Sequence, residues 1–377
     1  MKKVYLDYAA TTPTDPEVLA AMQPYFFEKS GNASSLHAYG QEAKKGVEDA
    51  REILAEFIGS KPEEIVFTSG GTESTNTAIT AALRDLGCKH IITSPIEHHA
   101  TLHTVEHMAH FGQARLSYVN LTDKGHVDLN HLEELLKGSK EKTLVTLMHA
   151  NNEIGNLLKI KAVGELCNKY DAIFHSDTVQ TVGHYPFDLK NLYVHFINGA
   201  GHKFHGPKGV GILYVNENVR IKPHIHGGSQ ERNMRAGTEN LYGIVGFAKA
   251  LELATQRYEE DSAHIRSLKS YMTERLQQTF PDIILNGDTN GSSLYTVLNV
   301  SFPMTEKSDM LLFSLDMAGI CVSGGSACTS GANSVSHVIK AIYNGRAADM
   351  VPIRFSFSRE NTKQEADSVI ERLKELV

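Results

Sequence analysis

Cysteine is scarce in this chain, whose 377 residues contain only Cys88, Cys167, Cys321 and Cys328. The four are widely spaced and no two form a CxxC pair, so the sequence predicts neither a disulfide framework nor a cysteine-based zinc site. A reducing compartment is the simpler environment for such a protein. An isolated cysteine is more often a small core residue than a reactive one, and we expect that role for Cys88 and Cys167.

Long apolar segments are also lacking. No run approaches the roughly 20 residues that a membrane helix requires, and the start, MKKVYLD, has no apolar signal core. Positive charge is not in excess, since 37 Lys and Arg against 44 Asp and Glu give a formal net charge of -7. Such a charge gives no general attraction to nucleic acid or anionic lipid. We therefore expect a soluble, cytoplasmic protein that acts on small molecules.

Histidine, by contrast, is abundant, with 19 residues. Glu97-His98-His99 and His224-Ile225-His226 are candidate metal-ligand fragments, but neither has the H-E-x-x-H spacing that places two imidazoles on one helix face. Histidine more often forms local hydrogen bonds or shapes a pocket. We expect no metal ion.

From about residue 16 to residue 260, short β-rich runs alternate with helical patterns, which is typical of a mostly parallel sheet covered by helices. Helical spacing is clearest at 75–83 and 162–170. The clearest strands are predicted at 64–68, 90–93, 143–148 and 172–175. Right-handed crossovers place the carboxyl ends of such strands along one edge of the sheet, where ligands of open α/β sheets bind.

The pattern changes beyond a charged helical stretch at 241–279. Predicted strands at 295–302 and 353–357 are separated by helix-like segments at 307–318 and 336–343, and a last helix covers 363–376. This indicates an α+β unit with a loop of small residues that begins at Ser323. We expect a large α/β domain at 16–260 and a small α+β domain made of 1–15 and 261–377.

The segment Thr68-Ser69-Gly70-Gly71-Thr72-Glu73-Ser74 lies between a predicted strand and a predicted helix. Small residues let backbone N–H groups approach an anion there, the helix dipole favours negative charge, and the Thr72 hydroxyl adds a donor. The segment therefore fits a phosphate, with Gly71 and Thr72 as contact residues. The alternative is an ordinary glycine turn between a strand and a helix, which is common in α/β proteins.

Asp177 follows a strand that should be buried, where an unpaired charge is costly. It therefore needs a cationic partner. A protonated pyridine nitrogen is one candidate, because holding that proton lets the ring accept electrons. A helix N-cap or a salt bridge is the ordinary alternative.

Two further segments carry reactive side chains. Gly199 to Gly211 is a glycine-dense loop with Lys203 and Lys208, either of which could form a Schiff base in a pocket that favours the neutral amine. Solvent-exposed lysines in a flexible loop are the alternative. Cys328 lies among small residues, so its thiol should be accessible, and its reactivity depends on a thiolate-stabilising environment.

In this order the motifs resemble those of the cysteine desulfurases, within the fold-type I pyridoxal-phosphate enzymes. The resemblance spans essentially the whole chain, because it includes YLDYAATTP at 5–13, GNASSLH at 31–37 and IRFS at 353–356. It implies a fold-type I architecture with a large, mostly parallel-sheet domain and a smaller α+β domain. It also implies an enzyme that uses pyridoxal 5'-phosphate to convert L-cysteine to L-alanine and collects the sulfur as a persulfide on Cys328.

The resemblance assigns a role to each matching residue. Lys203 becomes the Schiff-base lysine, which leaves Lys208 structural, and Cys328 and His98 join Lys203 as catalytic residues. Arg354 and Asn152 become substrate-binding residues, the guanidinium being suited to a bidentate grip on the amino acid carboxylate. The implied cofactor contacts are His98 stacked on the ring, Asp177 at the pyridine nitrogen, Gln180 at the phenolic oxygen, Thr72 and His202 at the phosphate, and Thr238 from the neighbouring subunit of a homodimer.

Several positions depart from the family pattern. Ala200 replaces a serine whose hydroxyl would reach the phosphate, and Ala33 and Val335 replace prolines, which alters loop stiffness. The chain stops at Val377, without the extension that some members use to dock a scaffold. The sulfur acceptor, an iron–sulfur scaffold or a tRNA-thiolation carrier, is therefore left open. The alternatives are a selenocysteine lyase or aminotransferase, which would not depend equally on Cys328, and a non-catalytic subunit of the same fold.

Overall fold

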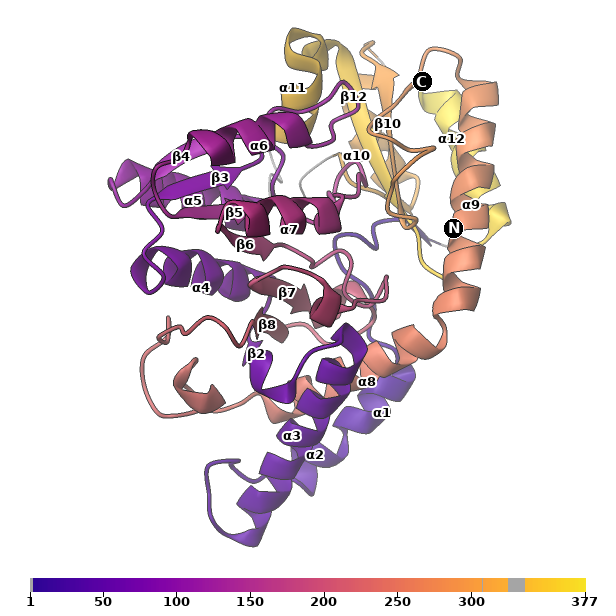
Figure 1. The fold of residues 1–377 in the computed structure, drawn as a ribbon. Helices are drawn as coiled ribbons and strands as arrows, with labels where there is room; N and C mark the ends of the chain where they lie inside the picture. Colours follow the sequence, from indigo (N-terminus) through magenta and orange to yellow (C-terminus); the bar gives the residue numbers. More distant parts are fainter. Residues whose placement is uncertain (1–2, 307, 325–335) are drawn as a thin grey trace.

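The computed structural model describes residues 3–306, 308–324 and 336–377. Its centre is a seven-stranded sheet in the order β2-β8-β7-β6-β5-β3-β4 (Figure 1). Strands β3 to β7 are parallel, whereas β8 is antiparallel to both of its neighbours. The predicted α/β class with a mostly parallel sheet is confirmed. The strands are β2 (Ile65–Thr68), β3 (His90–Thr93), β4 (Arg115–Tyr118), β5 (Thr143–Thr146), β6 (Ile173–Ser176), β7 (Phe196–Ala200) and β8 (Gly211–Val215).

Helices cover both faces of this sheet (Figure 1). Successive strand residues point to opposite faces, so each strand supplies side chains to two different cores. Val145 and Phe174 belong to the core beneath α3, α6, α7 and α8, whereas Leu144 and Ile173 belong to the core beneath α4 and α5. The covering helices are α3 (Ala38–Ile58), α4 (Gly71–Arg84), α5 (His99–His110), α6 (Leu129–Gly138), α7 (Ile160–Lys169) and α8 (Leu241–Gln256).

A second sheet is antiparallel, in the order β12-β10-β9, and a third pairs β1 with β11 in parallel. Their core contains Leu6 from the start of the chain together with Leu298 and Phe355. The domain boundaries at 16–260 and at 1–15 with 261–377 stay a prediction. The elements of this part are β1 (Val4–Tyr5), α9 (Tyr258–Thr279), β9 (Ile284–Leu285), β10 (Val297–Pro303), α10 (Leu311–Met317), β11 (Ile320–Cys321), α11 (His337–Tyr343), β12 (Met350–Ser356) and α12 (Lys363–Leu376).

Three expectations about local structure need correction. Helix α4 begins at Gly71, four residues earlier than predicted. The helical stretch 241–279 is two helices, α8 and α9, which separate at Arg257, where the guanidinium binds the carboxylates of Asp15 and Glu17. The glycine-dense loop 199–211 is partly regular, because it begins with the end of β7 and a 3-10 turn at Gly201–Lys203 and ends at the start of β8, with only 204–210 between them irregular.

Two absences hold for the described residues alone: no helix there is long and apolar enough to cross a membrane, and no three His, Cys, Asp or Glu side chains are placed to hold a metal ion. Cys88 and Cys167 are buried. Burial raises the pKa of the Cys88 thiol to about 12 and raises the pKa of Cys167 as well, so both are the inert core residues that we expected.

Candidate active site

A pocket of about 260 Å³ lies where the carboxyl ends of the parallel strands meet the first residues of the chain. The segments that follow β2, β3, β5, β6 and β7 contribute to its wall, which is the ligand-binding edge of an open α/β sheet. The structure thus brings together most of the predicted site residues. Nine of them line the pocket: Gly71, Thr72, His98, Asn152, Asp177, Gln180, His202, Lys203 and Arg354.

One end of the pocket is the start of α4, directly after β2. Gly70 has a φ of +153°, which favours glycine, and a Cβ added to Gly71 would lie 2.5 Å from Cγ2 of Val179. The backbone of Gly71 therefore approaches the wall more closely than any other residue type would allow. Backbone N–H groups of a first helical turn, together with the Thr72 hydroxyl, form a site suited to an anion.

Asp177 stands at the carboxyl end of β6 and is only 7% exposed. Its Oδ1 accepts a hydrogen bond from the N–H of Val179 at 3.0 Å, which closes a turn rather than capping a helix. Among the described residues no ion pair involves Asp177, so the salt-bridge alternative has no partner there. A buried carboxylate in a pocket wall favours a cationic ligand atom.

Two imidazoles in the wall are neutral. His98 caps α5, and its Nδ1 accepts the N–H of Ala100 at 3.1 Å, so the ring proton lies on Nε2. Burial lowers the pKa of His98, the Asp177 carboxylate opposes that shift and the Lys203 cation adds to it. Burial and Lys203 likewise lower the pKa of His202 to about 4.

The Lys203 side chain enters the pocket from the 3-10 turn after β7. Its Nζ donates to the carbonyl oxygens of Ala9 at 2.7 Å and Ala10 at 3.0 Å. Gln180 Nε2 donates to the same Ala9 oxygen at 3.0 Å, so the first residues of the chain hold both side chains in place. Lys208, the alternative that the sequence left open, is exposed and does not line the pocket.

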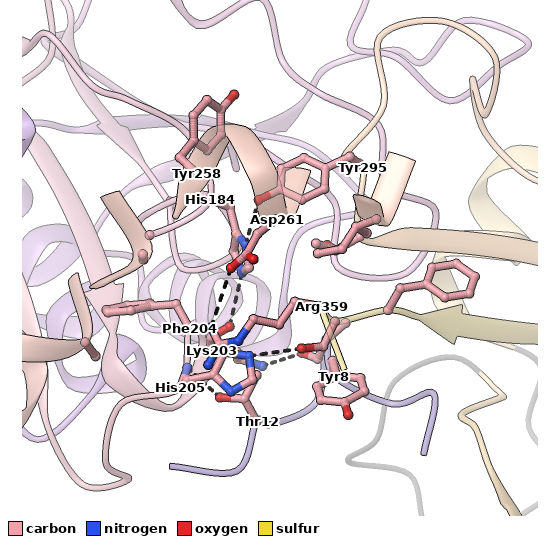
Figure 2. A pocket seen from close by; sticks show the side chains of 18 of the residues that line it. Tyr8, Thr12, His184, Lys203, Phe204, His205, Tyr258, Asp261, Tyr295 and Arg359 are labelled. Carbon is pink, nitrogen blue, oxygen red and sulfur yellow. Dashed lines mark hydrogen bonds and ion pairs between the residues drawn. The ribbon is translucent and has the colours of Figure 1, made fainter. Parts of the chain in front are cut away.

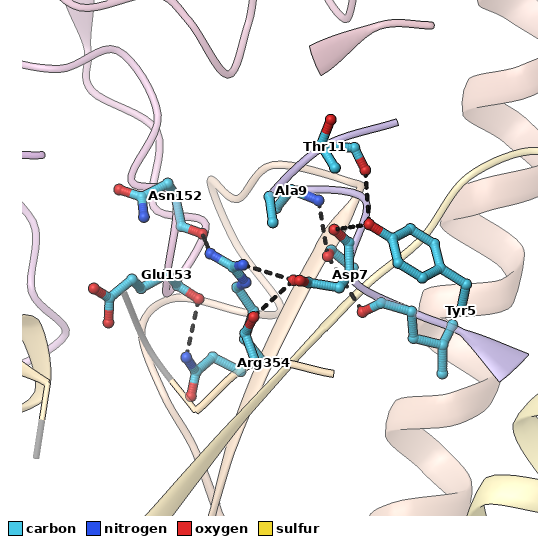
Figure 3. Close-up of polar contacts among 12 residues, drawn as sticks. Tyr5, Asp7, Ala9, Thr11, Asn152, Glu153 and Arg354 are labelled. Carbon is cyan, nitrogen blue, oxygen red and sulfur yellow. Dashed lines mark hydrogen bonds and ion pairs between the residues drawn. The ribbon is translucent and has the colours of Figure 1, made fainter. Parts of the chain in front are cut away.

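Arg354 of β12 also lines the pocket, and Figure 3 shows its contacts with Asp7 and Asn152. The residue is 2% exposed, and its guanidinium donates to Asp7 Oδ1 and to the carbonyl oxygen of Asn152, each at 2.8 Å. Its Nε is buried without a hydrogen-bond partner in the described structure. Because a buried donor without a partner is costly, the pocket is suited to a ligand that accepts hydrogen bonds beside Arg354.

Comparison with known proteins places this geometry in a family. The sequence profile of the aminotransferase class-V family matches residues 4–369. The chain is 42% identical over 378 residues to the cysteine desulfurase IscS of Dictyoglomus turgidum, a match that covers 100% of this chain and 95% of that protein. It is 41% identical to a protein of Bacillus subtilis described as putative cysteine desulfurase IscS 1, over 100% and 99% of the two chains. The chain belongs to the cysteine desulfurase family.

Solved structures agree with this assignment. A NifS-like protein superposes with a TM-score of 0.90 at 37% identity, covering 99% of this chain and 98% of the other. A structure described as SspA in complex with cysteine gives a TM-score of 0.79 at 30% identity, covering 95% of this chain and 100% of the other. The fold-type I architecture expected from the motifs is therefore confirmed, and the class-V aminotransferases to which the chain belongs are pyridoxal-phosphate-dependent enzymes.

Two predicted site residues are not part of the pocket. Cys328 lies outside the described residues, although Ser323 on one side of it and Ser336 on the other are described. Ser323 Oγ donates to Asp7 Oδ1 at 2.9 Å, so Asp7 contacts both Arg354 and the residue where the segment that contains Cys328 begins. Thr238 is exposed and does not line the pocket of its own chain, and its contact with a neighbouring subunit stays a prediction.

Sequence reasoning assigned no site role to two buried acids beside the pocket, although it considered Glu97 as part of a metal-ligand fragment. Glu97 adds no negative charge beside the pocket, because burial raises the pKa of its carboxyl well above the usual range and the Asp177 carboxylate adds to that shift. Burial also raises the pKa of Glu153, whose Oε2 accepts a hydrogen bond from Ser336 Oγ. Both acids adjoin predicted site residues in sequence, His98 and Asn152, and that adjacency was the only available signal.

Proposed function

We propose that the protein converts L-cysteine to L-alanine and transfers the sulfur to Cys328 as a persulfide, with pyridoxal 5'-phosphate as the cofactor. The observation that carries the proposal is the convergence of the Lys203 amine, the Asp177 carboxylate and the Arg354 guanidinium on one pocket. A protein with the same fold was solved in complex with cysteine, which supports the choice of substrate.

The residues of the pocket fit this cofactor. The close approach of Gly71 to Val179 and the first turn of α4 suit a phosphate, together with Thr72 and His202. Asp177 suits a protonated pyridine nitrogen, His98 lines the pocket where a ring could stack, and Gln180 can donate to a phenolic oxygen. When bound through the Lys203 amine, the cofactor supplies an electron sink for charge that develops on the substrate α-carbon.

The chain's own side chains would then bind the substrate and transfer its protons. Arg354 and Asn152 hold the substrate carboxylate, which orients the α-carbon toward Lys203. With the cofactor bound, the Lys203 amine would be placed to take the α-proton, and the Ala9 and Ala10 carbonyl oxygens are placed to accept hydrogen bonds from the resulting ammonium. The neutral His98, with its proton on Nε2, can pass a proton within the pocket.

Sulfur transfer requires the thiolate of Cys328 as nucleophile. Its attack on the substrate sulfur forms an S–S bond and breaks the C–S bond, whose electron pair stays on the carbon side and takes up a proton to give alanine. A thiol of an acceptor protein then takes the outer sulfur from the persulfide. We propose an iron–sulfur scaffold or a tRNA-thiolation carrier in the cytoplasm as that acceptor.

We further propose that the protein is a homodimer in which Thr238 contacts the cofactor phosphate of the neighbouring subunit. In support, several large apolar side chains are exposed on α1 (Pro16–Met22), on α2 (Pro24–Phe27), on α8 and around the start of α3, as expected for an interface. They are Leu19, Phe26, Phe27, Leu36, Tyr39 and Tyr242. Light scattering should give twice the mass of the chain.

The decisive experiment measures sulfide release from L-cysteine under reducing conditions, with pyridoxal phosphate added. Lys203→Ala and Cys328→Ala should both lose activity, whereas the matched controls Lys208→Ala and Cys321→Ala should keep it. Activity that survives Cys328→Ala would favour a lyase or an aminotransferase. No activity in any form, with no cofactor bound, would contradict the proposal.

A further inference from the structure

A second, smaller cavity of about 50 Å³ adjoins the pocket and shares Ala9, Gln180 and Lys203 with it. Figure 2 shows His184 in this cavity, between the backbone at Lys203 and the ring of Tyr295. Tyr295 belongs to the core of the antiparallel sheet, whereas Lys203 follows β7 of the large sheet. The cavity therefore lies between the two parts of the chain that together form the pocket.

Both ring nitrogens of His184 have a hydrogen-bond partner. Nε2 lies 3.1 Å from the carbonyl oxygen of Lys203, and Nδ1 lies 3.2 Å from the hydroxyl of Tyr295. Burial lowers the pKa of His184 to about 4, so the ring is neutral at physiological pH. Because a carbonyl can only accept, the single proton lies on Nε2, and Nδ1 accepts from the Tyr295 hydroxyl.

Neighbouring residues reinforce this contact. Gly183 has a φ of +81°, and a Cβ there would lie 2.4 Å from Cγ of Phe204, so the backbone before His184 packs directly against the residue after Lys203. On the other side of this turn, Thr12 Oγ1 donates to the carbonyl of His202 at 2.9 Å and accepts from the N–H of His205 at 2.7 Å. The backbone that carries Lys203 is thus held from two sides.

We propose that His184 is a positioning residue for Lys203: its neutral ring donates to the Lys203 carbonyl and fixes that backbone relative to Tyr295. This inference rests on the proposed function, in which the Lys203 amine is the reacting group. A shift of the backbone carbonyl moves the base of the lysine side chain, and misplacing a reacting group by about 1 Å costs on the order of 100-fold in rate.

Two substitutions at the same position separate this role from simple packing. In His184→Gln the amide nitrogen replaces Nε2 and can still donate to the Lys203 carbonyl. In His184→Asn the shorter side chain replaces the Nδ1 position and loses that donation. A positioning role therefore predicts that Gln behaves nearly as the unaltered protein and that Asn does not, whereas a packing role predicts similar damage from both.

The first readout needs no cofactor. In cofactor-free protein, the rate at which acetic anhydride acetylates Lys203, followed by mass spectrometry across pH, should change by at least about threefold in His184→Asn and stay unchanged in His184→Gln, consistent with the loss of one hydrogen bond. The matched control is His90, another buried histidine with a pKa lowered to about 4 and both nitrogens bonded, to Ser117 and Ser139. Neither His90→Gln nor His90→Asn should alter Lys203.

The second readout uses protein loaded with pyridoxal phosphate. His184→Asn should shift the pH midpoint of the cofactor absorption change and lower kcat about tenfold with little change in KM. Tyr295→Phe, which keeps the ring but removes the donor to Nδ1, should shift the midpoint in the same direction by less. Equal labelling and equal midpoints in the Gln and Asn variants would overturn the inference. Failure of every form to bind the cofactor would instead overturn the proposed function, while the labelling experiment would still decide the role of His184.

Discussion

Replacing Gly71 with alanine tests the phosphate end of the pocket. The φ of Gly71 lies outside the left-handed region, so an alanine backbone is allowed there. The added methyl would, however, lie 2.5 Å from Cγ2 of Val179. Two carbon atoms in contact prefer roughly 3.5 to 4 Å, so either Val179 or the first turn of α4 must move by about 1 Å.

The expected cost follows from this overlap. Overpacking a well-filled site costs roughly 1 to 3 kcal/mol. If the first turn of α4 moves, the loss appears in cofactor binding, and about 1.4 kcal/mol corresponds to a tenfold change in Kd. We therefore expect Gly71→Ala to weaken pyridoxal-phosphate binding by roughly 5-fold to 150-fold, measured by absorbance titration of cofactor-free protein.

A second substitution makes this reasoning refutable. Val179→Ala removes Cγ2, so the double variant should recover most of the lost affinity, and Val179→Ala alone must be measured to complete the cycle. Gly138→Ala is the matched control, because a Cβ there meets nothing within 4 Å. Unchanged affinity in Gly71→Ala, or a double variant as weak as the single one, would show that the contact with Val179 does not shape the phosphate site.

Three further predictions concern buried titratable groups, each checked by urea unfolding. Glu153→Gln keeps an acceptor for Ser336 and should leave stability nearly unchanged, whereas Glu153→Ala should cost about 1 to 3 kcal/mol. Burial lowers the pKa of His175 to about 4, so the unfolded chain binds more protons between about pH 6.5 and 4 and stability falls as the pH falls through that window; His175→Leu should reduce that fall. Burial raises the pKa of Glu97, so its contribution is present at low pH and is lost as the pH rises above the ordinary glutamate pKa of 4.5 toward the raised one. Glu97→Gln should therefore gain stability over the unaltered protein as the pH rises from that value.

The large sheet was predictable because its strands are short apolar runs between turns. The strand at 90–93 and the helix at 363–376 match the structure residue for residue. The break at Arg257 was not predictable, because no glycine or proline marks it and the ion pairs to Asp15 and Glu17 that fix it span more than half of the chain. The local pattern of apolar residues therefore predicts helices and strands, whereas a break such as the one at Arg257 depends on side chains that are distant in sequence.

In the site, too, the residues that follow predicted strands were predictable, whereas those whose role depends on distant contacts were not. Gly71 and Asp177 follow predicted strands of one sheet, so the rule that ligands bind at the carboxyl edge brings them together from sequence alone. Lys203 follows β7, a strand that the sequence analysis did not predict, and only the family resemblance singled it out. Asp7 and His184 were missed, because their roles depend on contacts with Arg354 and with the Lys203 carbonyl. Asp7 belongs to the YLDYAATTP segment that carried the resemblance, and His184 follows Gln180 by four residues, but no role had been assigned to either side chain.

Burial decides the protonation state of several titratable groups in and beside this pocket. Glu97 is held in the neutral form, as are His98 and His202, so none of these three groups adds a charge at or beside the pocket. An ionised Glu97 would repel both a phosphate and a substrate carboxylate, and protonated imidazoles would compete with a cationic ligand atom for Asp177. With these three groups neutral, an anionic ligand meets the cations Lys203 and Arg354 and uncharged donors, and Asp177, the one carboxylate among the described residues that line the pocket, is suited to a cationic ligand atom.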